Sequence, residues 1–313
     1  MDKIVFLEPV FCERIWGGRN LEKFSIPQGN IGEAWVIAAH DNGSSKITNG
    51  ELAGLTLKEA YEKQPTLFTE KKYDKFPLLI KILDASDNLS VQVHPEDDYA
   101  RENENGELGK TECWYVLDAK AGAKLVYGHT AKTKEEFTDK INHEQWQELF
   151  IEEEVKAGDF FYIPAGTLHA IGEGILIYEV QQNSDTTYRV YDYDRVDKDG
   201  NKRELHIEKT KDVTKVPFEK VTTSPKTEKL EGATVTYLAD EKYFSVFKVE
   251  VEGQVSLEKT QTGNLFTVLK GSGNVEIEGS IYDVKKGDSF ILTTDCSNYT
   301  LKGNMFLVGS YDR

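Results

Sequence analysis

Two histidines, a glutamate and a glutamine occur in strand-like segments and could together bind a metal ion. They are Gln92, His94, Glu112 and His169. Two imidazoles and one carboxylate, with an amide oxygen nearby and one coordination position left open, are typical of a catalytic zinc site. Non-haem iron enzymes use the same combination of two histidines and one carboxylate. The residue types therefore predict a catalytic metal centre and leave the metal open between zinc and iron.

His169 ends a compact pattern of glycine, aromatic and proline residues within 158–172. Residues 160–163 are an aromatic and β-branched run, which favours a strand. Pro164 ends this run because proline cannot donate to a ladder, and Gly166 permits the positive φ of a sharp reversal. We expect a strand, a tight turn and a returning strand paired as a hairpin, with His169 at the start of the second strand.

The other candidate ligands lie on predicted strands as well. Residues 89–94 alternate with period two, so Gln92 and His94 share one face of their strand. Glu112 shares a predicted strand face with Trp114. Alternatively, Gln92 and Glu112 are ordinary exposed strand residues, and spacing alone does not separate the two interpretations.

An internal repeat relates the ligand-bearing segments to the C-terminal part of the chain. The matched segments are 114–117 with 266–269 and 158–163 with 287–292. The same register places the ligands and turn residues of the first copy on polar residues of the second: Glu112 on Asn264, Pro164 on Thr293, Gly166 on Asp295 and His169 on Asn298. We therefore expect the first copy to hold the metal and the second to be structural.

The predicted elements divide the chain into two β-rich parts. We expect a catalytic domain over residues 1–230 and a smaller β domain without metal ligands over residues 231–313. Short helices are predicted within the first domain, at about 54–64 and 131–150, where capping boxes precede apolar residues with helical spacing. Residues 193–232 are mostly charged and polar, which favours a connector.

The charge and the cysteine content limit the classes of function. The formal net charge of −16 argues against nucleic acid or an anionic membrane surface as a partner. No apolar run is long enough for a signal peptide or a membrane span. The three cysteines, at unrelated spacings, favour reduced thiols. We therefore expect a cytoplasmic protein that binds neither nucleic acid nor a membrane.

The candidate ligands belong to a longer set of motifs. The spacing Gly158-x5-Pro164-x-Gly166-x2-His169 matches the second motif of the cupin superfamily. The whole set resembles the type I mannose-6-phosphate isomerase (phosphomannose isomerase) family in its short bacterial form. The usual first cupin motif, with two close histidines, is replaced by a glutamine-x-histidine pair and a distant glutamate, a departure that this family shares. The motifs that carry the resemblance are residues 16–18, 32–35, 92–95, 109–115, 164–170 and 181–195.

The resemblance implies a mainly β fold of two cupin-type jelly-roll halves with a few short inserted helices. It implies an isomerase that interconverts D-mannose 6-phosphate and D-fructose 6-phosphate through an enediol(ate) intermediate, as a monomer or a homodimer. It further implies one Zn²⁺ per chain and two sets of site residues: Gln92, His94, Glu112 and His169 as metal ligands, and Arg189, Lys110 and Asp185 as catalytic residues.

Two other functions stay open at this point. A cupin oxygenase would use iron in the same ligand set, and a non-catalytic module would bind sugar phosphate without turnover. Gln92 as an additional ligand favours zinc, and the set of Lys110, Asp185 and Arg189 argues against a non-catalytic module. The sequence does not choose between Asp185 and Lys110 as the base. Arg195 is a further cation that could help to bind the phosphate.

Overall fold

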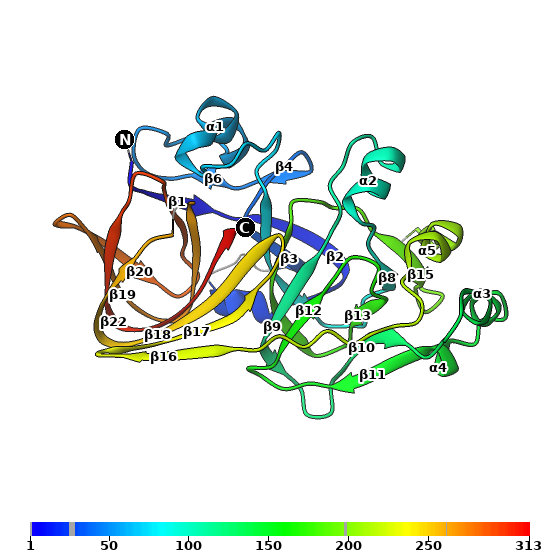
Figure 1. Ribbon diagram of the computed structural model, residues 1–313. Coiled ribbons are helices and arrows are strands. Elements are labelled where there is room, and N and C mark those ends of the chain that lie inside the picture. Colours follow the sequence, from blue (N-terminus) through cyan, green and yellow to red (C-terminus); the bar gives the residue numbers. More distant parts are fainter. Residues whose placement is uncertain (1, 25–28, 197–198, 261) are drawn as a thin grey trace.

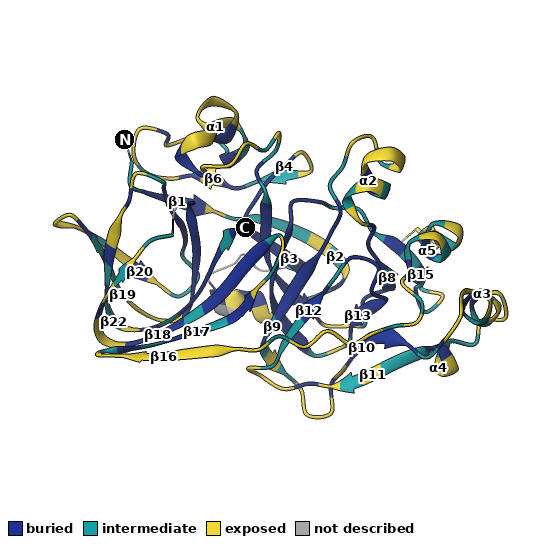
Figure 2. Ribbon diagram, viewed as in Figure 1, coloured by how far each residue is buried: buried dark blue, intermediate teal, exposed yellow. Residues whose placement is uncertain are grey.

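The chain folds into two β-rich halves that lie side by side (Figure 1). The structure, a computed structural model, describes residues 2–24, 29–196, 199–260 and 262–313. Most of the N-terminal half, blue to green, lies on the right of Figure 1, and the C-terminal half, yellow to red, lies on the left. Buried residues follow the strands of both halves (Figure 2). The predicted mainly β fold with a few short helices is confirmed.

Two sheets pack face to face in the N-terminal half. Their inner faces share an apolar core that includes Leu83, Trp114 and Ile177 from one sheet and Leu125 and Tyr127 from the other. The first sheet contains, in spatial order, β12 (Phe160–Ile163), β9 (Glu112–Ala119), β14 (Ile175–Gln182), β7 (Leu78–Ala85), β2 (Val10–Gly18) and β3 (Ile31–Ile37). The second contains β11 (Phe150–Glu154), β10 (Lys124–His129), β13 (His169–Ile171), β8 (Val91–Val93) and β15 (Tyr188–Tyr191).

The C-terminal half is built on one large antiparallel sheet with its own apolar core. In spatial order its strands are β16 (Lys226–Leu230), β17 (Ala233–Asp240), β18 (Phe244–Glu258), β22 (Asn298–Asp312), β19 (Asn264–Ile277), β21 (Ser289–Leu292), β1 (Ile4–Glu8) and β6 (Lys46–Ile47), and β20 (Ser280–Lys285) pairs with β19. Strands β4 (Ala39–His40) and β5 (Gly43–Ser44) form a separate small pair. The start of the chain therefore joins the C-terminal sheet through β1, and a domain boundary near residue 230 stays a prediction.

The strand register of the two halves agrees with the internal repeat. Strand β12 pairs with β9 in the same register as β21 pairs with β19, so Asn264 occupies the position that Glu112 has in the first half. Asn298 begins β22 as His169 begins β13, but Asn298 is exposed. The candidate ligands therefore belong to the first half.

Short helices lie on the outside of the sheets. Their bounds are α1 (Leu57–Lys63), α2 (Asp97–Asn103), α3 (Lys134–Asn142), α4 (Trp146–Leu149) and α5 (Ile207–Val213). Helices α1, α3 and α4 lie in the two predicted inserts, and Thr56 opens α1 with a complete capping box. Among the residues described, no helix is both long and apolar enough to cross a membrane. The cytoplasmic location stays a prediction.

The prediction of a hairpin within residues 158–172 is wrong. Strand β12 pairs with β9 in the first sheet, whereas β13 pairs with β8 and β10 in the second. The turn between them crosses from one sheet to the other: Gly166 has a φ of 87°, and its backbone N–H donates to the His94 carbonyl at 2.8 Å. This crossing carries His169 to the opposite sheet from Glu112, so that the two side chains can face each other.

The segment 193–232 contains more structure than a polar connector. Helix α5 and strand β16 lie within it. Several of the charged side chains that suggested a connector form ion pairs close to the sandwich, as Arg203 does with Asp192 at 2.6 Å. Arg203 of this segment also lines the cavity of the candidate site.

Candidate metal centre and the adjoining cavity

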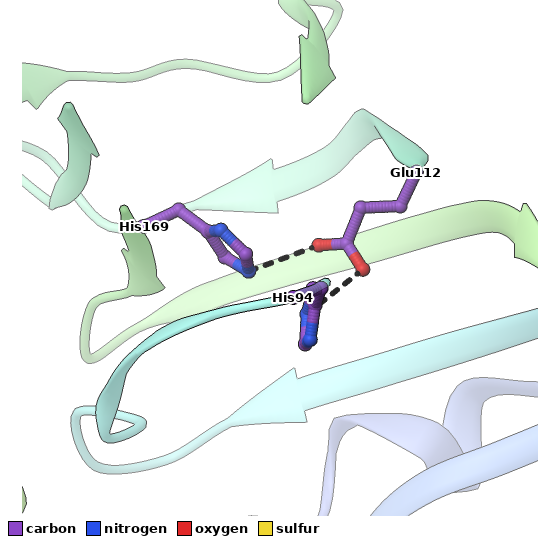
Figure 3. Close-up of side chains that lie close together, drawn as sticks. All are labelled: His94, Glu112 and His169. Atoms are coloured by element: carbon purple, nitrogen blue, oxygen red, sulfur yellow. Dashed lines mark ion pairs between the residues drawn. The ribbon is translucent and has the colours of Figure 1, made fainter. Parts of the chain in front are cut away.

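His94, Glu112 and His169 converge between the two sheets of the N-terminal half (Figure 3). One potential ligand atom from each residue lies within 4.8 Å of the others. The Nε2 atom of His169 is 3.2 Å from Oε1 of Glu112, and Nε2 of His94 is 3.4 Å from Oε2. All three side chains are buried. The sequence predicted these residues, and the fold brings them together.

Strand pairing explains how the ligands meet. Glu112 begins β9 in one sheet, and His169 begins β13 in the other. In the second sheet, Gln92 lies directly opposite both His169 and Arg189. Directly opposed residues of antiparallel strands project from the same face. Gln92 and Arg189 therefore project from the same face as His169, and His94, two residues after Gln92, continues that face.

The ligand atoms themselves lack hydrogen-bond partners. The Nδ1–H of His94 donates to the carbonyl of Thr186, and the Nδ1–H of His169 donates to the carbonyl of Thr167, both at 2.8 Å. A neutral imidazole with Nδ1 protonated presents an unprotonated Nε2 as a lone pair. Neither Nε2 atom nor either carboxylate oxygen of Glu112 has a hydrogen bond in the described part of the chain. Four buried atoms with lone pairs facing one another fit a divalent cation well.

The electrostatics also favour a metal ligand set. Burial and the charge of Lys110 lower the pKa of His94 to about 3, so its imidazole is neutral at physiological pH. Burial disfavours the charged form of Glu112, but the Lys110 ammonium, 3.3 Å from Oε2, together with His94 and His169 outweighs this effect and holds the pKa of Glu112 well below its usual value. A neutral imidazole and an ionised carboxylate are the forms that bind a metal.

A cavity of about 430 Å³ lies next to the ligand cluster: His94, Glu112 and His169 do not line it, but Lys110, 3.3 Å from Glu112, and Gln92, the strand partner of His169, do. The predicted residues Gln92, Lys110, Asp185 and Arg189 all line it. Further residues that line it are Glu13, Arg14, Ile15, Trp16, Glu33, Lys81, Leu83, Leu89, Ser90, Trp114, Ile171, Glu179, Thr187 and Arg203. The volume suits a ligand the size of a small sugar phosphate.

Arg189 and Asp185 differ in how their charges are compensated. Burial and the nearby charge of Arg203 lower the pKa of Arg189, and its Nε has no hydrogen-bond partner among the described residues. Burial alone would raise the pKa of Asp185, but the charge of Lys81 and a hydrogen bond from Asn42 hold it below the usual value. Arg189 is therefore a cation available to an anionic ligand, and Asp185 is an ionised carboxylate beside the cavity.

Several further charged side chains, which were not among the predicted site residues, line the cavity. Lys81 of β7 lies directly opposite Glu179 of β14, which lies opposite Trp114 of β9. The Lys81 Nζ is 3.6 Å from Glu179 and 4.0 Å from Glu33, and the Trp114 indole N–H donates to Glu179 at 2.8 Å. Arg14 donates two hydrogen bonds to Glu33, at 2.9 and 3.3 Å. The available signal was a charged residue within a run of mostly apolar residues, Lys81 within 78–83 and Glu179 within 175–180.

Replacing Lys81 with methionine is expected to lower the free energy of unfolding by about 3–5 kcal/mol, because Glu33 and Glu179 lose the buried cation between them. Burial would lower the pKa of Lys81, but Glu33 and Glu179 raise it, so the amine is charged at neutral pH. Urea unfolding measures the change. The control is Lys120→Met, which removes a lysine from an exposed pair with Glu173 and is expected to cost at most about 1 kcal/mol. Equal losses in the two variants would contradict this account.

Arg195, the further cation considered for the phosphate, lies outside the cavity lining. It donates to Asp87, to the Asn88 carbonyl and to Asp192. Arg203 lines the cavity instead. Its position depends on how the segment after β15 folds back, which no local pattern predicts.

Known proteins resemble this chain over nearly its full length. Residues 4–117 match the catalytic domain of type I phosphomannose isomerase, and residues 233–312 match the cupin domain of mannose-6-phosphate isomerase. The mannose-6-phosphate isomerase ManA of Bacillus subtilis is 48% identical over 301 residues, which cover 96% of each chain. A mannose-6-phosphate isomerase of Streptococcus mutans is 45% identical over 314 residues, which cover 99% of each.

Solved structures give the same result. The crystal structure of a mannose 6-phosphate isomerase from Bacillus subtilis has a TM-score of 0.96 and 43% identity, and the match covers 99% of this chain and 100% of that one. A zinc-bound mannose 6-phosphate isomerase matches with a TM-score of 0.79 over the full length of both chains, and at 17% identity it supports the fold alone. With these relatives and the His94–Glu112–His169 centre in place, the chain belongs to the type I phosphomannose isomerase family.

Proposed function

We propose that this protein is a zinc-dependent aldose–ketose isomerase that interconverts D-mannose 6-phosphate and D-fructose 6-phosphate. The observation that carries the proposal is the pair of unprotonated histidine nitrogens that face an ionised glutamate beside a cavity lined by Arg189. The relatives, which are named mannose-6-phosphate isomerases, supply the substrate. Four relatives that match nearly the full length of the chain carry the name of this isomerase, which favours it over the iron-dependent oxygenase.

The metal would be held by His94, Glu112 and His169, with the amide oxygen of Gln92 as a fourth ligand. Three residues whose facing atoms lack hydrogen bonds, with Gln92 projecting from the same sheet face as His169, suit the tetrahedral preference of zinc. When bound, zinc supplies Lewis-acid polarisation of a sugar carbonyl or hydroxyl oxygen. One ion per chain is expected, because the C-terminal half has asparagines at the positions of Glu112 and His169.

The costly species in this isomerisation is the enediolate, and two cations of the chain could stabilise it. Arg189 has an uncompensated guanidinium beside the cavity, which can bind a developing oxyanion or a phosphate oxygen. Lys110 has its ammonium 3.3 Å from the ligand Glu112, so it can donate a hydrogen bond to a sugar oxygen held close to the metal ligands.

Proton transfer between C1 and C2 needs a group that is unprotonated at neutral pH. Asp185 is ionised because its pKa is held below the usual value, whereas the amine of Lys110 forms an ion pair with Glu112. We therefore assign Asp185 as the group that accepts the proton from the sugar carbon and returns it to the neighbouring carbon. Lys110 then acts as a hydrogen-bond donor to the oxygens.

Turnover of mannose 6-phosphate should stop when the protein is treated with a chelator and return when zinc is added. A coupled assay that follows fructose 6-phosphate measures both changes, since metal affinity and activity share the same ligands. Full activity in metal-free protein would contradict the proposal. Oxygen consumption with added iron, without isomerisation, would instead support the oxygenase.

A further inference from the structure

The segment after β15 folds back toward the candidate site, and Arg189 forms two hydrogen bonds with the residue at its far end, His206. The backbone N–H of His206 donates to the Arg189 carbonyl at 2.7 Å, and the Arg189 backbone N–H donates to Nδ1 of His206 at 3.2 Å. These two bonds join β15 to His206, the residue before α5. Arg203, one of the described residues between them, lines the cavity.

Within this segment, one buried carboxylate receives two guanidinium groups. Nε of Arg203 donates to Oδ2 of Asp192 at 2.8 Å, and a terminal nitrogen donates to Oδ1 at 2.6 Å. Arg195 donates a further hydrogen bond to the same Oδ1 at 2.5 Å. Asp192 is 5% exposed, and a bidentate contact of this kind fixes the plane of the Arg203 guanidinium. The position of Arg203 is thus set by Asp192 rather than by its own flexible chain.

The charges beside this part of the cavity do not balance. Arg14, another arginine that lines the cavity, is neutralised by its two hydrogen bonds to Glu33. Arg203 pairs with Asp192, and Arg195 pairs with both Asp192 and Asp87. By contrast, Arg189 lines the cavity without an ion pair among the described residues, so one guanidinium beside Arg203 stays unpaired within a chain of net charge −16.

Two hydroxyl side chains that line the cavity also suit an anionic ligand. Ser90 and Thr187, which line the cavity with the two arginines, carry hydroxyl groups that can donate to an anion. Arg203 lies close enough to Arg189 to lower its pKa. The two guanidinium groups therefore repel each other in the free protein. A dianion placed between them would remove that repulsion and form charge-assisted hydrogen bonds with both.

We propose that Arg203 binds the phosphate group of the sugar together with Arg189, and that Asp192 is the residue that positions Arg203. This assignment rests on the proposed isomerase function, and it names a substrate-binding residue that the sequence motifs did not include. The reacting end of the sugar would then lie at the metal centre, and the arginine pair would bind its phosphate group.

The test is the Arg203→Ala variant, with steady-state kinetics and calorimetric binding of inorganic phosphate to the zinc-loaded protein. We expect the KM for mannose 6-phosphate and the Kd of phosphate to rise by roughly tenfold to a hundredfold, the effect of a lost charge-assisted hydrogen bond. We expect kcat to stay within about threefold, since Arg203 does not contact the reacting carbons. Asp192→Asn should produce a smaller rise in the same two quantities.

The matched control is Lys202→Ala. Lys202 is the neighbouring residue in the chain, carries the same charge, is exposed, and forms its ion pair with Asp194 rather than lining the cavity. It should leave both KM and the phosphate Kd unchanged. Arg203→Lys, which keeps the charge but loses the bidentate contact, should fall between wild type and Arg203→Ala, and it serves as the test if the alanine variant does not fold.

Unchanged KM and phosphate affinity in the Arg203 variants would overturn the proposal, and so would an equal effect of Lys202→Ala. Phosphate binding is measured without turnover, so the difference in Kd between wild type and the Arg203 variants reports on this arginine separately from catalysis. A wild-type protein that binds phosphate through Arg203 but does not isomerise mannose 6-phosphate would refute the proposed function and leave this anion site standing.

Discussion

A Glu112→Gln variant is expected to lose its bound zinc and its isomerase activity together. The substitution keeps the size of the side chain but removes the negative charge that lies 3.2 and 3.4 Å from the two histidine nitrogens. Lys110, which Glu112 now neutralises, would then repel an incoming cation. Changes to groups that merely orient ligands cost roughly 10–100-fold in metal affinity, and loss of a ligand should exceed that.

Metal analysis after dialysis, together with the isomerase assay, measures both losses. The matched control is Glu152→Gln, which removes a carboxylate from an exposed ion pair with Lys124 on the outer strand β11. The control should keep its zinc and its full activity. Retention of stoichiometric zinc by Glu112→Gln would show that the carboxylate is not a ligand.

Replacing Arg189 with alanine is expected to reduce kcat/KM by roughly 100–1000-fold while zinc stays bound. The guanidinium of Arg189 has an unpartnered Nε and lines the cavity, but it contributes no ligand to the cluster of His94, Glu112 and His169. Its loss should therefore remove stabilisation of negative charge without affecting metal content. Arg189→Lys should recover only part of the activity, since an ammonium cannot make two parallel hydrogen bonds.

A suitable control for Arg189→Ala is Arg101→Ala, which removes an exposed arginine paired with Asp98 on helix α2. This variant should be as active as wild type. If Arg189→Ala kept full activity, Arg189 would not be an active-site residue; if it lost zinc as well, its role would be structural rather than in binding the substrate.

Local patterns identified the candidate metal ligands, and the family resemblance favoured the ligand interpretation over that of ordinary strand residues. Period-two alternation placed Gln92 and His94 on one face, and the glycine and proline pattern before His169 marked the start of a strand. These features depend only on the pleat of a strand and on turn chemistry, which are properties of neighbouring residues. The structure brings His94, Glu112 and His169 together, in agreement with the sequence.

Strand partners could not be predicted in the same way. The turn at Pro164 and Gly166 was expected to close a hairpin, but it crosses between the two sheets. A reversal signal fixes a change of direction, whereas the choice of partner depends on which distant strand covers the apolar face. Here β9 and β8 supply those partners.

The remaining residues of the cavity were missed for a related reason. Lys81 and Glu179 lie in apolar strands, and their charges are compensated by each other across β7 and β14. Arg203 lies in a segment that was predicted to be a polar connector, and its hydrogen bonds to Asp192 hold it beside the cavity. Each of these positions depends on pairing between residues that are distant in the chain. The sequence shows the charged residues, but it does not show which of them lie together.

We propose that a zinc ion bound by His94, Glu112 and His169 supports turnover. Anomalous diffraction from crystals of the active protein, recorded on both sides of the zinc absorption edge, can locate this ion. We expect a single strong zinc peak per chain among these three side chains. A zinc peak at a different position in the chain, or the absence of any peak in protein with full activity, would contradict it.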